Sequence, residues 1–148
     1  MSWKNLLAIR TVQAHTTSDT EIKELRNLVS RDLKDAAITG LSADRRFATA
    51  YNAVLQLSKM AIACAGYRIA TGVGHHQKTF EAVKLALGAP SEKLADYFEV
   101  CRRKRNFIDY DHAEVVTEGE ADELLEKAQE FQDLVEEWIA DNYPAFKA

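Results

Sequence analysis

Apolar residues recur at intervals of three and four along most of this chain, and this spacing constrains the fold more than any other sequence feature. Such spacing places apolar side chains on one face of a helix with 3.6 residues per turn. No segment shows the period of two that is typical of a strand. The chain also holds only six Gly and two Pro, fewer than a loop-rich all-β sandwich needs. The sequence therefore predicts an all-α fold, an up-and-down antiparallel four-helix bundle with one additional short helix.

Capping residues and helix breakers set the boundaries of these helices. Two capping boxes, Ser18 with Glu21 and Thr117 with Glu120, mark the starts of the first and last helices. Gly40 is expected to be the C-cap of the first helix. The five expected helices cover residues 18–40, 42–69, a short segment that ends at 88, 91–112 and 118–141.

The length of 148 residues suits one domain, residues 1–148, because a second hydrophobic core would be too small. Residues 1–17 are expected to form an N-terminal arm or short helix, and residues 142–148 a C-terminal tail. The longest stretch without a charge, residues 47–58, is shorter than the ~17–25 residues of a membrane helix. The N-terminal residues also lack the pattern of a secretory signal. We therefore expect a cytoplasmic protein with no membrane span.

The cysteine and histidine spacing predicts no metal site and no cofactor. Cys64 and Cys101 lie within apolar helical patterns, without a CxxC motif, which favours reduced core thiols over a disulfide or a zinc site. His75 and His76 follow Gly74 at a loop-to-helix junction with no third ligand nearby. A capping or packing role is therefore favoured for this pair over a metal or phosphate site.

The charge of the chain is unevenly distributed. The net charge is −4, but residues 118–148 hold ten acidic and two basic side chains, which leaves residues 1–117 with a net charge of +4. Four basic residues stand together at 102–105. The overall acidity therefore excludes a globally basic nucleic-acid coat protein, and it leaves room for a local basic site.

The expected helix 91–112 carries charges where apolar residues are expected. On a helical wheel, the apolar stripe defined by Leu94, Phe98, Cys101 and Ile108 also contains Arg105, Asp109 and His112. Ionisable side chains are rarely buried unless they are paired. One interpretation is an Arg–Asp–His ladder within a surface helix, because Asp109 lies four residues after Arg105 and three before His112. The other is that the stripe faces a polar partner, such as a second chain or an RNA phosphate.

The segment from Arg105-Asn106 to His112 resembles the signature of the HEPN superfamily. This signature is an Arg followed by a polar residue and then, after a total gap of four to six residues, a His. Here the gap is six and the motif reads Arg-Asn-x5-His. The resemblance extends to the expected layout, since the motif lies near the end of the penultimate long helix and an acidic amphipathic helix follows. Tyr51-Asn52-Ala53 also looks like part of the second helix of bacterial members. The HEPN-like layout covers nearly the whole chain.

The resemblance implies a metal-independent endoribonuclease that acts as a homodimer, with the site at or near the interface. His112 would act as the general acid or base, and Arg105 would hold the scissile phosphate. Asn106 would orient a neighbouring group. Arg102, Arg103 and Lys104 would bind the RNA backbone, and Asp109 and Tyr110 would support the site.

The sequence also departs from one HEPN subtype. Toxins that pair with a nucleotidyltransferase carry a Tyr two residues after the His, where this chain has Glu114, and Tyr110 instead precedes the His. One hypothesis is a ribonuclease of a toxin–antitoxin or defence system, with a cognate antitoxin. The alternative is a noncatalytic HEPN dimer that serves as an RNA- or nucleotide-binding or protein-interaction module. A third is a helical interaction protein in which the Arg–Asp–His ladder is structural.

Overall fold

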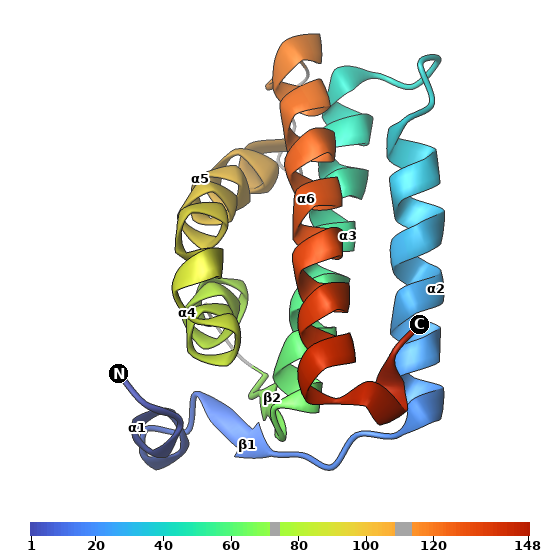
Figure 1. Ribbon diagram of the computed structural model, residues 1–148. Coiled ribbons are helices and arrows are strands. Elements are labelled where there is room, and N and C mark those ends of the chain that lie inside the picture. Colours follow the sequence, from blue (N-terminus) through green and yellow to red (C-terminus); the bar gives the residue numbers. More distant parts are fainter. Residues whose placement is uncertain (72–74, 109–113) are drawn as a thin grey trace.

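The computed structural model describes residues 1–71, 75–108 and 114–148, with the side chains of residues 75–77 also outside the description. Six helices pack together in the described part of the chain, which is 76% helical. A two-stranded antiparallel sheet lies at one end of the long helices (Figure 1). In chain order the elements are α1 (Trp3–Ala8), β1 (Val12–Ala14), α2 (Asp19–Ala36), α3 (Ala43–Cys64), β2 (Tyr67–Ile69), α4 (His75–Leu87), α5 (Glu92–Ile108) and α6 (Glu118–Asn142), with short 3-10 turns at Ala89–Ser91 and Pro144–Phe146.

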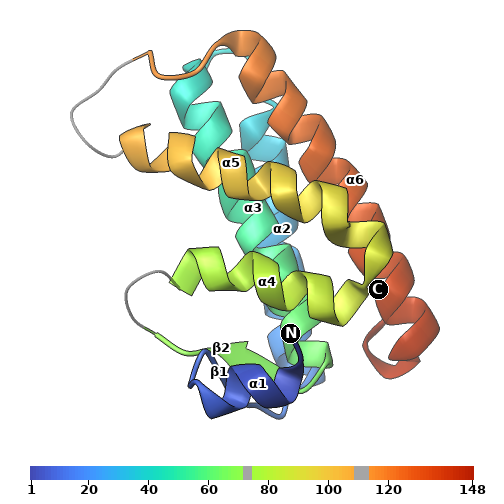
Figure 2. The ribbon, with the colours of Figure 1, turned by 90° about the vertical axis from the view of Figure 1, so that its left-hand side faces the viewer.

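The helices form two sets that run in different directions. Helices α2, α3 and α6 lie alongside one another, with α2 running opposite to α3 and α6 (Figure 1). Helices α4 and α5 form an antiparallel pair that lies across them (Figure 2). Because α5 crosses the long helices, its C-terminal turns reach the side of the molecule near the start of α3. None of the helices that the structure describes is both long enough and apolar enough to span a membrane.

Most of the predicted helix starts agree with the structure. The hydroxyl oxygens of Ser18 and Ser42 accept hydrogen bonds from the backbone N–H groups of Glu21 and Arg45. Thr117 forms the predicted capping box with Glu120. Such side chains satisfy backbone donors that the first turn of a helix leaves unpaired. The predicted capping box at Ser18 is half formed, because the Glu21 carboxylate contacts His15 and Thr17 instead.

The predicted helix ends, by contrast, were partly wrong. Helix α2 ends at Ala36 with Ala37 as its C-cap, so Gly40 is not the cap. Helix α3 ends at Cys64 and not near Ile69, because the chain turns at Gly66, whose φ of 99° favours glycine. One helix start also differs from the prediction: the helix expected from residue 91 begins at Glu92, and Ser91, expected as its cap, lies in the preceding 3-10 turn and donates its hydroxyl to the carbonyl of Gly88 at 2.8 Å.

The prediction that the chain has no strand was also wrong. Strand β1 pairs with β2 in the register Val12↔Ile69, Gln13↔Arg68 and Ala14↔Tyr67. The rings of Trp3 and Tyr67 stack with centroids 4.3 Å apart, which fastens α1 to the sheet. Each strand has three residues, too few to show a period of two in the sequence. The sheet thus joins the N-terminal arm to the end of α3.

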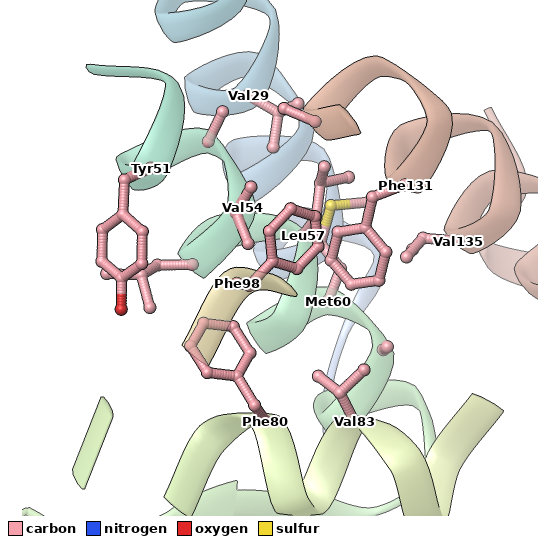
Figure 3. Close-up of a cluster of buried hydrophobic side chains, with 14 of the residues drawn as sticks. Val29, Tyr51, Val54, Leu57, Met60, Phe80, Val83, Phe98, Phe131 and Val135 are labelled. Atoms are coloured by element: carbon pink, nitrogen blue, oxygen red, sulfur yellow. The ribbon is translucent and has the colours of Figure 1, made fainter. Parts of the chain in front are cut away.

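Aromatic side chains fill the core where α5 crosses the long helices (Figure 3). The Phe98 ring of α5 lies 6.0 Å from that of Phe80 on α4 and 5.1 Å from that of Phe131 on α6, measured between centroids. Tyr51 of α3 packs edge-on against Phe80 at 6.2 Å. The two cysteines are free and buried, as predicted for core thiols. This packing fixes the first half of α5 against the rest of the molecule.

A buried arginine at the start of α3 joins three helices at the end of the molecule away from the sheet. Arg46, 6% exposed, donates to the carbonyl of Ala36 at 2.8 Å, to Glu118 at 2.9 Å and to Asp122 at 2.6 Å. These contacts hold together the end of α2, the start of α3 and the start of α6. The carboxylates raise the pKa of Arg46, Asp122 most strongly.

Candidate functional site

The candidate site is the last two turns of α5, which carry five of the predicted site residues. Residues 102–106 all lie within α5. The predicted catalytic His112 and the supporting Asp109 and Tyr110 fall in the segment 109–113, outside the described residues. The structure therefore describes Arg105 and Asn106 of the Arg-Asn-x5-His motif, and not its histidine. The functional roles assigned to all eight residues stay predictions.

Arg105 lies on the inward face of α5, as the helical wheel predicted. Its side chain is half-buried, and its Cζ atom is 5.9 Å from the centroid of the Tyr51 ring. At this distance the ring face attracts the guanidinium. Tyr51 is fully buried, and this burial raises the pKa of its phenol, while the positive charges of Arg102 and Arg105 lower it. A neutral aromatic side chain of α3 thus positions a permanently charged guanidinium near the end of α5.

Arg102 and Lys104 are engaged with carboxylates of their own chain. The Arg102 guanidinium donates to both oxygens of Glu99, with contacts of 2.7–3.1 Å, and this hydrogen bonding raises the pKa of Arg102. Lys104 forms an ion pair with Glu120 on α6. The Lys104 ion pair joins α5 to α6, and both contacts reduce the positive charge that two of the predicted RNA-binding residues offer a ligand.

Arg103, Asn106 and Phe107 are exposed on the last turns of α5. Arg103 makes no ion pair within the part of the chain that the structure describes. Phe107 is 58% exposed and Val100 is 53% exposed. Since Val100, Arg103 and Phe107 follow one another at intervals of three and four, they form one exposed stripe, hereafter the outer stripe. Val100 and Phe107 were not among the predicted site residues, although both lie on the side of the helical wheel away from the apolar stripe of α5.

His75 and His76 lie in the first turn of α4, and their side chains are outside the description. Over the described ranges, no group of three or more His, Cys, Asp and Glu side chains could hold a metal ion.

Comparisons of the chain with family models, with curated proteins and with solved structures give no match. The resemblance to the HEPN superfamily therefore depends on the motif and the layout alone.

Proposed function

We propose that this protein is a HEPN-type endoribonuclease that acts as a homodimer and needs no metal or cofactor, as part of a toxin–antitoxin or defence system. The observation that carries the proposal is the position of Arg105, held over the ring of Tyr51 beside Asn106 and seven residues before His112. A fixed guanidinium suits a phosphate whose negative charge grows during cleavage. His112 would move the proton, because an imidazole ionises near neutral pH.

The outer stripe supports the dimer. Val100 and Phe107 are large apolar side chains that are more than half exposed, on the helix that carries the motif. A second chain that covers Phe107 would contact the exposed face of the last turns of α5, beside Asn106. Arg103, between the two apolar residues, could contact either the second chain or the RNA backbone.

A second candidate function is a noncatalytic HEPN dimer that binds RNA, a nucleotide or a protein. The ion pairs of Arg102 with Glu99 and of Lys104 with Glu120 favour it. They leave Arg103 as the basic side chain of the 102–104 run that contacts no carboxylate in the described structure, so a smaller electrostatic contribution to RNA binding is expected.

Cleavage of a fluorescently labelled single-stranded RNA in EDTA separates these functions. For the endoribonuclease we expect cleavage by the wild-type protein, and a loss of at least about 100-fold in Arg105→Ala and in His112→Ala, the scale of one acid–base or electrostatic group. Arg31→Ala, an exposed position of α2, is the control and should cleave normally. Cleavage that survives His112→Ala would overturn the role of His112.

RNA binding by fluorescence anisotropy completes the design. RNA that binds the wild-type protein without being cut, with binding weakened in Arg103→Ala, would support the noncatalytic module. Equilibrium sedimentation of Phe107→Asp tests the dimer, because a charge on the outer stripe should shift the protein to a monomer. A Phe107→Asp variant that sediments as the wild-type protein does would remove the outer stripe from the interface.

A further inference from the structure

A cavity of about 420 Å³ lies at the opposite end of α3 from Arg105. Its walls come from α2, α3, β2 and Thr79 of α4, with His15 at the edge. Tyr51, under Arg105, and Ile62, in the cavity wall, are eleven residues apart on α3, or about 16 Å along the helix. The cavity is therefore separate from the candidate ribonuclease site. Its volume lies within the ~300–1,000 Å³ of small-molecule sites.

The inner wall of this cavity is apolar. Five aliphatic side chains line it, three from α3 and one each from α2 and β2: Leu55, Ile62, Ala63, Leu25 and Ile69. Leu55, Ile62 and Ala63 are almost fully buried in the protein. An apolar ligand body would gain free energy by replacing water along this wall.

Two cations stand on different elements at the mouth of the cavity. Lys59 projects from α3 and Arg68 from β2, and both are exposed. Gln13 of β1 accepts a hydrogen bond from the Nε of Arg68 at 3.0 Å, which fixes that side chain across the sheet. Neither cation forms an ion pair with a carboxylate in the described residues. Arg102 and Lys104 of α5, by contrast, are both paired.

Among the described residues that line the cavity, the one carboxylate is already engaged. The Oε1 atom of Glu21 lies 2.7 Å from Nε2 of His15 and accepts a hydrogen bond from the Thr17 hydroxyl at 2.6 Å. These contacts hold Glu21 in its ionised form, since the hydrogen bond from Thr17, followed by the effect of His15, lowers its pKa. With one anion against two cations, the mouth keeps an excess of positive charge.

We propose that this cavity binds a small organic acid, with its apolar body against Leu55 and Ile62 and its carboxylate between Lys59 and Arg68. The aliphatic wall favours the hydrocarbon part, and the two cations select the charged end. A neutral molecule of the same shape would make the apolar contacts with the wall but not the charge contacts with the two cations. The binding site does not depend on the ribonuclease function, because none of its residues belongs to the motif.

Octanoate and 1-octanol are suitable probes, because they share a chain length and differ in charge. Titration of the full-length 15N-labelled protein, followed by NMR, measures both affinities and identifies the residues that shift. We expect octanoate to bind more tightly than 1-octanol, with shifts confined to α2, the end of α3 and β2. No saturable binding of octanoate, or shifts centred on another part of the protein, would overturn the proposal.

The double variant Lys59→Gln, Arg68→Gln tests the carboxylate contact. We expect it to weaken octanoate binding by about tenfold and to leave 1-octanol binding unchanged, since two charge contacts are lost. The matched control, Lys34→Gln with Arg45→Gln, removes the same charge from exposed positions away from the cavity. Equal weakening of octanoate binding in both double variants would show a general charge effect and overturn the site.

Ala63→Leu tests the apolar wall, because its larger side chain enters the cavity. It should weaken both probes, and the NMR spectrum reports whether the variant is folded. If the folded Ala63→Leu variant binds both probes as the wild-type protein does, the ligand lies elsewhere. The two double variants change exposed side chains only, so they test the proposal even if Ala63→Leu does not fold.

Discussion

Two inward-facing arginines, Arg46 at the start of α3 and Arg105 near the end of α5, have different surroundings. Arg46 is 6% exposed and donates to a carbonyl and two carboxylates from α2 and α6. Arg105 is half-buried and lies over the ring of Tyr51. Carboxylates of α6 compensate the charge of Arg46, and an aromatic ring of α3 helps to fix the position of Arg105.

Arg46 therefore joins helices, and Arg105 lies where the proposed phosphate site would be. The contacts of Arg46 join three helices and leave its charge compensated inside the protein. The Tyr51 ring gives Arg105 a defined place near the exposed residues Asn106 and Phe107. Stability should therefore depend mainly on Arg46, and any activity toward a phosphate mainly on Arg105.

The largest effect on stability is expected for Arg46→Met. Methionine keeps much of the aliphatic volume but leaves the Ala36 carbonyl without its donor and separates α3 from Glu118 and Asp122. We expect the free energy of unfolding to fall by about 2–4 kcal/mol, the range for a buried charged group with several hydrogen bonds. Urea denaturation followed by circular dichroism measures this change.

Arg45→Met is the matched control for this prediction. Arg45 is the neighbouring arginine and is exposed, so its replacement should change stability by less than about 0.5 kcal/mol. If the two variants lose equal stability, the contacts of Arg46 do not hold the helices together, and the contrast with Arg105 fails.

The parts of this fold that sequence could predict are those determined by neighbouring residues. The cap at Ser18 and the capping box at Thr117 were predicted because the partners lie within one turn. The end of α3 was missed because the apolar pattern continues past Cys64 into β2, while the backbone turns at Gly66. The sheet was missed because its strands are short and 52 residues separate them.

In the candidate site, too, contacts between residues far apart in the sequence could not be predicted. The helical wheel placed Arg105 on the inward face of α5, but its partner Tyr51 lies on another helix, 54 positions earlier, so spacing could not identify the contact. The basic run 102–105 looked like one cationic patch, yet Glu99 and Glu120 engage two of its members. The cavity beside Lys59 has walls from four elements, and no local pattern predicts it.

A smaller effect is expected from the contact between Arg105 and Tyr51. In a double-mutant cycle with Arg105→Ala and Tyr51→Leu, we expect a coupling energy of about 1 kcal/mol in urea denaturation. The cycle is needed because Tyr51→Leu alone also removes packing against Phe80. Tyr51→Phe keeps the ring and should keep most of the coupling. No coupling in the first cycle would show that the ring does not hold the guanidinium.

The smallest expected effect is a change in how often the end of α5 opens. The labelling rates of the two cysteines measure this opening. Cys101 lies one turn before Arg105, and Cys64 lies at the far end of α3; burial raises the pKa of both thiols to about 11. Neutral, buried thiols react with iodoacetamide only when the surrounding structure opens, so labelling measures local opening. We expect Arg105→Ala to speed labelling of Cys101 by at most about fivefold, the factor for about 1 kcal/mol, and to leave Cys64 unchanged.

Arg46→Met should instead speed the labelling of both cysteines, because it lowers the stability of the whole helical assembly. Mass spectrometry of the digested protein measures the two rates separately. Equal acceleration at Cys64 and Cys101 in Arg105→Ala would mean that Arg105 stabilises the entire fold as Arg46 does. The Arg–Asp–His ladder would then be the better interpretation of the motif, because the main role of Arg105 would be to stabilise the fold and not to bind a phosphate.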